Sequence, residues 1–94
     1  MHIDDFIWLP DIAEKLAVKH NVTQDEAEEV FFNQPRFRFV EKGHRRGEDV
    51  YAALGQTDSG RYLIIFFLRK PNRLALILSA RDMDRKERRK HGNS

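Results

Sequence analysis

The segment RYLIIFFLRKPNRLALILSA, residues 61–80, decides the fold of this 94-residue chain. Residues 62–68 and 74–78 are two uninterrupted apolar runs rich in Ile, Leu and Phe, and Pro71-Asn72 stands between them. Apolar runs of this length, bounded by turn residues, are typical of strands covered on both faces. Two such strands joined by a short turn form an antiparallel hairpin, and we expect the other elements to pack on it.

Two further strands precede this hairpin. Residues 36–40 (RFRFV) alternate strictly, which places two Phe side chains on one face of a strand and two Arg side chains on the other. Residues 41–49 are polar and contain two glycines, which is typical of a loop, and residues 50–56 resume as a strand. Residues 57–60 (TDSG) predict the turn that leads into the central hairpin.

The N-terminal part of the chain predicts a short strand and two helices. Residues 6–8 form the strand, which Pro10 ends, and residues 11–20 carry apolar side chains at helical spacing. A second helix begins at residues 23–26 (TQDE), where the Thr and Glu side chains form a capping box, and it ends before Pro35.

The predicted order is a strand, two helices, four strands and a final helix over about residues 85–90. This order indicates an α+β fold: a four- to five-stranded, mainly antiparallel sheet with two N-terminal helices packed on one face and a short C-terminal helix. A single domain spans residues 1–94. The final helix has almost no apolar residues, so we interpret it as a solvated tail, and we expect residues 92–94 to fray.

Composition excludes several classes of protein. Cysteine is absent, which rules out disulfides and thiolate metal sites and fits a reducing cytosol. No apolar run approaches the roughly 20 residues that a membrane span needs. The first ten residues show no basic region followed by a long apolar stretch, so we expect no signal peptide. The expected location is therefore cytoplasmic, with no membrane partner.

Charge is divided unevenly along the chain. Residues 1–35 hold eight acidic residues against two basic ones, whereas residues 36–94 hold seven acidic residues against fifteen basic ones. Such asymmetry points to a polyanionic partner, RNA or DNA, for one face of the protein. The alternative is a basic surface that serves only solubility.

The sequence shows no metal or cofactor motif. The four histidines have no pair at helical ligand spacing, and no acidic cluster has the spacing of a two-metal nuclease. Residues 43–47 lack the Gly-Lys-Ser/Thr that ends a phosphate loop. We interpret the acidic residues of the second helix as a solvated face. We therefore expect no cofactor and no metal.

Cationic side chains supply the remaining chemistry. RNA can be cleaved without a metal if a base removes the 2′-OH proton, a cation steadies the pentavalent phosphate and an acid protonates the leaving oxygen. Arginine suits the cation role because its fork pairs with two phosphate oxygens. Arg61 and Arg81 flank partner strands at the same end of the hairpin, and we expect both to grip one phosphodiester. His44 and Glu48 are the candidate proton carriers.

A second set of residues is predicted to bind RNA. Arg36, Arg38 and Arg46 extend the cationic surface, and Tyr51 could stack on a base. For each arginine the alternative is a surface ion pair worth about 0–1 kcal/mol. For Tyr51 the alternative is packing in or on the sheet.

Three segments carry a family pattern in order and at matching spacing. They are Trp8, Pro10, Ala13 and Lys19-His20; residues 53–57 (ALGQT) with Gly60-Arg61; and residues 78–81 (LSAR) with residues 87–89 (ERR). Together they resemble the BrnT family of bacterial type II toxins, and the resemblance covers nearly the whole chain. In this comparison Arg81 matches the family's arginine after I-S-A, and Arg61 matches the basic residue that opens the strand.

The resemblance implies a RelE-like ribonuclease fold and a small toxin that cleaves RNA, including ribosome-associated mRNA, and so arrests translation. It also implies a BrnA-like antitoxin with a ribbon-helix-helix DNA-binding part. That partner neutralises the toxin and represses their shared operon, so the toxin meets DNA only through the antitoxin.

Two other functions stay open. Many family members carry a basic residue just before the Leu-Gly step, where this chain has the uncharged Val50, Tyr51 and Ala52. A catalytically weak or inactive toxin-like protein that only binds a ribbon-helix-helix repressor is therefore one alternative. The other is direct nucleic-acid binding by the basic run at residues 85–91.

Overall fold

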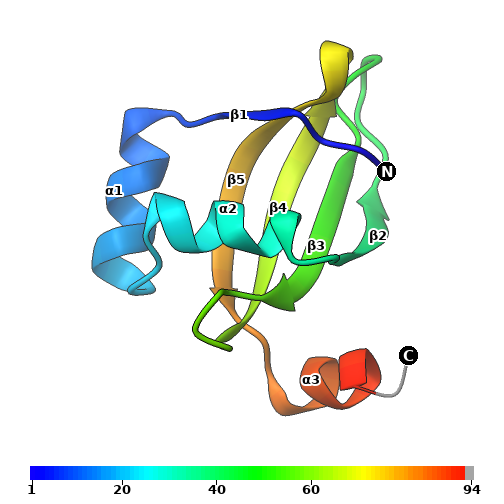
Figure 1. Ribbon diagram of the computed structural model, residues 1–94. Coiled ribbons are helices and arrows are strands. Elements are labelled where there is room, and N and C mark those ends of the chain that lie inside the picture. The colour runs from blue at the N-terminus through cyan, green and yellow to red at the C-terminus, as the bar shows by residue number, and fades with distance from the viewer. Residues whose placement is uncertain (93–94) are drawn as a thin grey trace.

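The computed structural model describes residues 1–92 and confirms the predicted order of elements and the α+β fold class. Figure 1 shows a twisted sheet, two helices across one side of it and a third helix at one end. Of the residues expected to fray, Asn93 and Ser94 lie outside the described part, and Gly92 ends the last helix. The elements are β1 (Asp5–Ile7), α1 (Pro10–Lys19), α2 (Gln24–Phe32), β2 (Arg36–Glu41), β3 (Val50–Gln56), β4 (Tyr62–Lys70), the 3-10 turn η1 (Pro71–Arg73), β5 (Leu74–Asp82) and α3 (Arg85–Gly92).

The central hairpin is confirmed. β4 and β5 pair antiparallel, from Leu63 opposite Asp82 to Lys70 opposite Leu74. The connecting turn η1 places Asn72 and Arg73 at φ angles of 65° and 60°. Asn tolerates this left-handed region better than most residues, which explains its place at the turn.

The sheet has five strands in the order β1-β5-β4-β3-β2. Three neighbouring pairs are antiparallel, and only the short β1 runs parallel to its neighbour β5. β4 is the middle strand, flanked on both sides, which accounts for its long apolar run. Among residues 1–92, no helix combines the length and hydropathy that a membrane crossing requires.

One face of the sheet is covered by α1 and α2, and we call it the helix-covered face. Leu16 of α1 and Val30 of α2 are buried there against Ile65 and Phe67 of β4 and Ile77 of β5. The apolar residues that predicted the two helices are thus the ones that bury against the hairpin.

The acidic residues of α2 were interpreted as a solvated face, and this interpretation is wrong. The capping box is present, with Glu26 and Thr23 bonding reciprocally, but three carboxylates also bond to other elements. Glu26 accepts a hydrogen bond from the Arg61 guanidinium, Glu28 from the Trp8 indole and Glu29 from the Asp58 amide. These bonds tie α2 to the segments at its two sides.

The opposite face, which we call the α3 face, holds a smaller apolar cluster. It consists of Ala52, Leu54, Ile64 and Met83, with partly buried aromatic neighbours. Met83 lies in the short link between β5 and α3 and leads the chain onto this face. In Figure 1, α3 lies at the end of the sheet nearest the β3–β4 turn.

The prediction that α3 is a solvated tail is wrong, although the helix has no buried residue. Polar and charged side chains, and not an apolar stripe, fix the position of this helix. Arg36 donates to the Lys90 carbonyl at 3.2 Å. The Arg88 guanidinium lies 4.3 Å from the centre of the Tyr62 ring. Cation–π and polar contacts of this kind can dock a helix that has no hydrophobic face.

A β-bulge in β5 decides which face its C-terminal residues occupy. Phe67 pairs with Ile77 and Phe66 pairs with Ser79, so Leu78 is an extra residue without a direct partner. One inserted residue shifts the alternation of every later side chain to the other face. Ile77 therefore lies in the helix-covered core, and so does Ala80, three residues later.

Candidate functional site

Arg61 lies on the helix-covered face and joins several elements. Its guanidinium donates to both oxygens of Asp82, at 2.8 and 3.1 Å. It also donates to the carbonyls of His20 and Asn21 at 3.1 and 2.6 Å and to Glu26 at 3.2 Å. The hydrogen bond from Arg61 lowers the pKa of Asp82. Arg61 is therefore fully engaged within the folded protein.

Arg81 lies on the α3 face. It pairs opposite Ile64, and its guanidinium lies 5.8 Å from the centre of the Phe66 ring. It donates to both oxygens of Glu87 at 2.8 and 2.9 Å, which is the bidentate geometry of a strong charged pair. This hydrogen bond lowers the pKa of Glu87. The side chain is 39% exposed, so it also faces solvent.

Arg61 and Arg81 share one end of the sheet, as predicted, but their guanidinium groups do not meet. Arg61 precedes β4 and contacts the segment after α1, whereas Arg81 contacts α3 on the other side of the sheet. The expectation that both grip one phosphodiester is therefore wrong. The bulge at Leu78 is the physical reason, because without it Arg81 would share the face of Arg61.

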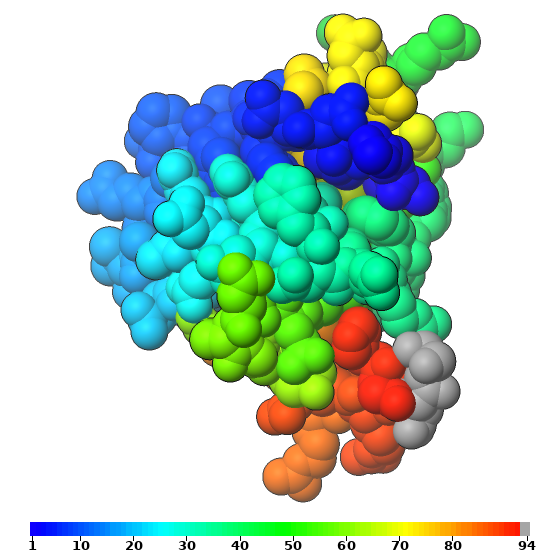
Figure 2. Space-filling view, viewed as in Figure 1, coloured from blue at the N-terminus to red at the C-terminus, as the bar shows by residue number. Residues whose placement is uncertain are grey.

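His44, Glu48 and Arg46 lie at the opposite end of the sheet. Their loop precedes Val50, which pairs with Leu68 near the end of β4. β4 has nine residues, about 30 Å at the usual rise per residue. Figure 2 shows this separation, with the 3-10 turn at one end of the molecule and α3 at the other. The four predicted catalytic residues thus do not form one site.

Tyr51 lies on the helix-covered face, away from Arg36 and Arg38. Its ring stacks on Phe67 at 6.1 Å between ring centres and meets Phe39 edge-on at 5.6 Å. The structure therefore shows Tyr51 packed on the sheet, which was the alternative to stacking on a base. Tyr51 and the two arginines of β2, all predicted to bind RNA, lie on different faces of the sheet.

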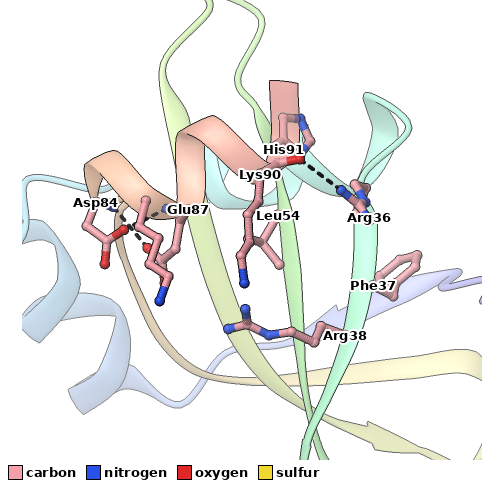
Figure 3. Close-up of a pocket in the computed structure, with 9 residues that line it drawn as sticks. Arg36, Phe37, Arg38, Leu54, Asp84, Glu87, Lys90 and His91 are labelled. Carbon is pink, nitrogen blue, oxygen red and sulfur yellow. Dashed lines mark hydrogen bonds between the residues drawn. The ribbon is translucent and has the colours of Figure 1, made fainter. Parts of the chain in front are cut away.

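The α3 face contains a pocket of about 400 Å³ between β2, β3 and α3. The alternation of β2 turns Arg36 and Arg38 onto this face, opposite Leu54 and Ala52 of β3. Figure 3 shows Arg38 and Lys90 extending into the space between the strand and the helix. We call this the basic pocket; its lining residues are Arg36, Phe37, Arg38, Leu54, Asp84, Lys86, Glu87, Lys90 and His91.

The basic pocket has an excess of unpaired positive charge. Its two carboxylates already have partners: Glu87 is bonded to Arg81, and Asp84 accepts the Glu87 amide at 2.7 Å as the helix cap. Within residues 1–92, the side chains of Arg38 and Lys90 form no ion pair. The positive charge of Arg38 helps to lower the pKa of Glu87. Arg38 therefore lies close to the Arg81–Glu87 pair. Arg38, Lys90 and Arg81 thus gather at one place.

Sequence reasoning identified Arg36, Arg38 and Arg81 but missed Lys86 and Lys90 as members of this site. The basic run at residues 85–91 was visible, but no apolar stripe indicated which way α3 would fold back. A signal was present in the spacing of Asp84 and Glu87, since a capped helix directly after β5 must begin at this end of the sheet.

The part of the chain that the structure describes contains no group of three His, Asp or Glu residues close enough to hold a metal ion. A mutual contact between Tyr62 and His91, with ring centres 6.1 Å apart, places the His91 ring at the edge of the basic pocket. The pocket can therefore offer cations from two elements and an apolar wall to an anionic ligand.

The protein-family model described as "Ribonuclease toxin, BrnT, of type II toxin-antitoxin system" matches residues 8–87. Among curated proteins, none matches the chain.

Proposed function

Because the chain belongs to the BrnT family of type II toxin–antitoxin ribonuclease toxins, we propose that it is a metal-independent ribonuclease that inhibits translation in the cytoplasm. Its substrate is single-stranded or ribosome-associated RNA. A cognate BrnA-like antitoxin with a ribbon-helix-helix part neutralises it. The family supports an RNA substrate and an antitoxin partner, and the finer statements are our proposal.

The observation that carries the proposal is the basic pocket beside Arg81. RNA binding requires cations that can reach backbone phosphates, and this pocket collects them from β2 and α3. Arg81 adds a partly exposed guanidinium beside the pocket, where it is paired with the lining residue Glu87.

In this proposal Arg81 stabilises the charge that develops on the phosphate in the transition state. Both oxygens of the Glu87 carboxylate accept hydrogen bonds from the Arg81 guanidinium, so an incoming phosphate must displace that carboxylate. Arg36 and Arg38 contact the RNA backbone. Proton transfer by His44 or Glu48 stays a prediction only for a phosphodiester bound at their own end of the sheet. A proton carrier must lie within hydrogen-bond reach of the reacting group, so neither residue serves a phosphate held by Arg81. RNA binding by Arg46, at the same end of the sheet, stays a prediction. Stacking of an RNA base on Tyr51 also stays a prediction, and it would have to compete with the packing of that ring against Phe67 and Phe39.

The test is the growth of bacteria expressing the chain without its antitoxin, together with cleavage of single-stranded RNA by the purified protein in EDTA. We expect growth arrest and EDTA-resistant cleavage from the wild type. Arg81→Ala should lose arrest and slow cleavage by roughly 10²- to 10³-fold, the usual cost of removing one transition-state donor. The control is Arg69→Ala, because Arg69 is exposed at the other end of the hairpin. Arrest that persists in Arg81→Ala at equal expression would contradict the proposal.

The alternative is a toxin-like binding module without catalysis. It is favoured by the environment of Arg61, whose guanidinium is engaged in the fold, and by the uncharged residues at the start of β3. Purified protein that forms a tight complex with the product of the neighbouring gene, yet cleaves no RNA, would support this alternative.

A further inference from the structure

We propose that the basic pocket is a binding subsite for one backbone phosphate of single-stranded RNA, with Arg38 and Lys90 as its two cationic ligands. This inference rests on the proposed function, since it says where that substrate is held. The family match ends at residue 87, so it assigns no role to Lys90. The two side chains come from elements far apart in the sequence, and Figure 3 shows them extending toward each other.

The β2–β3 ladder and one side-chain hydrogen bond fix the two elements that carry these cations. Arg38 lies in the β2–β3 ladder opposite Ala52, which fixes the face that its side chain occupies. The neighbouring Arg36 donates to the Lys90 carbonyl at 3.2 Å. Arg36 is therefore a positioning residue, because its bond holds the last turn of α3 over the pocket and keeps Lys90 facing Arg38.

The electrostatic balance calls for an anion. Four cationic side chains line the pocket against two carboxylates. Both carboxylates already have partners: Glu87 is bonded to Arg81 of β5, and Asp84 accepts the Glu87 amide. Like charges on Arg38 and Lys90 repel where they converge, and within residues 1–92 neither side chain has an ion pair of its own to offset that repulsion. A bound anion between them would remove that repulsion.

Shape and chemistry favour a phosphate of RNA over a carboxylate of a partner protein. An arginine fork with a lysine point charge suits the several oxygens of a phosphate. The volume of about 400 Å³ lies within the range of small-ligand pockets and leaves room for the attached sugar. Leu54 provides an apolar wall for that part of the nucleotide.

The test is binding of a fluorescent single-stranded RNA whose 2′-hydroxyl groups are methylated, so that it cannot be cleaved. Anisotropy titrations would compare the wild type with Arg38→Gln, Lys90→Gln and the double variant. We expect each single substitution to weaken binding by roughly tenfold and to reduce the salt dependence by about 0.7 in the log–log slope. The double variant should lose less than the product of the two single effects, because both side chains hold the same phosphate.

Matched controls are Arg69→Gln and Lys42→Gln, which remove exposed cations from other parts of the chain. We expect them to change affinity by less than twofold. Single variants that behave like these controls would overturn the subsite, and so would fully multiplicative effects in the double variant. Loss of antitoxin binding with unchanged RNA binding would also overturn it, since the pocket would then serve the partner protein.

Cleavage assays on the same variants separate this inference from the proposed function. A wild-type protein that binds RNA through Arg38 and Lys90 but cleaves none contradicts the ribonuclease and leaves the subsite standing. A wild-type protein that cleaves RNA, with both variants binding normally, contradicts the subsite alone.

Discussion

Two arginines that look alike in the sequence have different surroundings in the folded chain. Arg61 donates to two backbone carbonyls and two carboxylates, which belong to the segment after α1, to α2 and to β5. Arg81 has one carboxylate partner, on α3, and a more exposed side chain. The free energy of unfolding should depend more on Arg61, and contact with a ligand should depend more on Arg81.

We predict that Arg61→Ala lowers the free energy of unfolding by about 1–2 kcal/mol, because it removes the partner of two half-buried acceptors, the Glu26 carboxylate and the His20 carbonyl. Urea unfolding followed by circular dichroism measures this. Arg69→Ala, which removes an exposed arginine, should change the value by less than about 0.5 kcal/mol. If Arg61→Ala retains full stability and loses cleavage, Arg61 has the catalytic role first predicted for it.

Among the elements, α3 is the one held with the least apolar contact. It has no buried residue, and its contacts include an ion pair, a cation over a ring, one ring–ring contact and one side-chain bond to a carbonyl. The α1 and α2 helices instead bury leucine, valine and alanine side chains against the sheet. Local stability follows buried apolar area, so α3 should be the easiest element to remove or displace.

A chain that ends at Asp84 should therefore fold. We expect it to lose about 1–2 kcal/mol of unfolding free energy, the sum of a few exposed polar contacts, and to lose RNA affinity along with Lys90. Thermal unfolding and the anisotropy titration measure the two effects. The comparison is Ile77→Ala, a buried core substitution that should cost about 2–5 kcal/mol. A truncated chain that does not fold would show that α3 is part of the core.

At the scale of the whole molecule, three carboxylates bond to arginines of other segments and are held below their usual pKa. The pKa of Glu26 is lowered chiefly by the Thr23 amide and then by Arg61. The pKa values of Asp82 and Glu87 are lowered by hydrogen bonds from Arg61 and Arg81. In each case the folded state favours the ionised form, so the unfolded state takes up protons first as the pH falls.

The stability contributed by these carboxylates is therefore present above about pH 4, near the ordinary pKa of free Asp and Glu, and is lost as the pH falls through their lower folded-state values. We predict that the melting temperature drops steeply between about pH 4.5 and pH 3. Arg61→Ala should start lower at pH 7 and fall less on acidification, since it has already lost two of the three pairs. An equal fall in both proteins would show that other groups control the acid limit.

Much of the fold followed from local patterns. The two apolar runs predicted the hairpin, the capping box predicted the start of α2, and the alternation of residues 36–40 predicted that Arg36 and Arg38 share a face. These features depend on neighbours within a few residues, so a reader of the sequence can find them. The family assignment likewise followed from short motifs in order.

What the tertiary structure alone decided is which functional residues meet. A strand alternates with period two, so one unpaired residue at Leu78 moves Arg81 to the face opposite Arg61. The accommodation of that residue depends on how β5 pairs with β4, which no local pattern specifies. In the same way, the composition of α3 predicts a helix, but its position beside β2 depends on contacts with Arg36, Arg81 and Tyr62. Sequence determined the elements and the chemistry they carry; pairing and packing between distant segments determined the site.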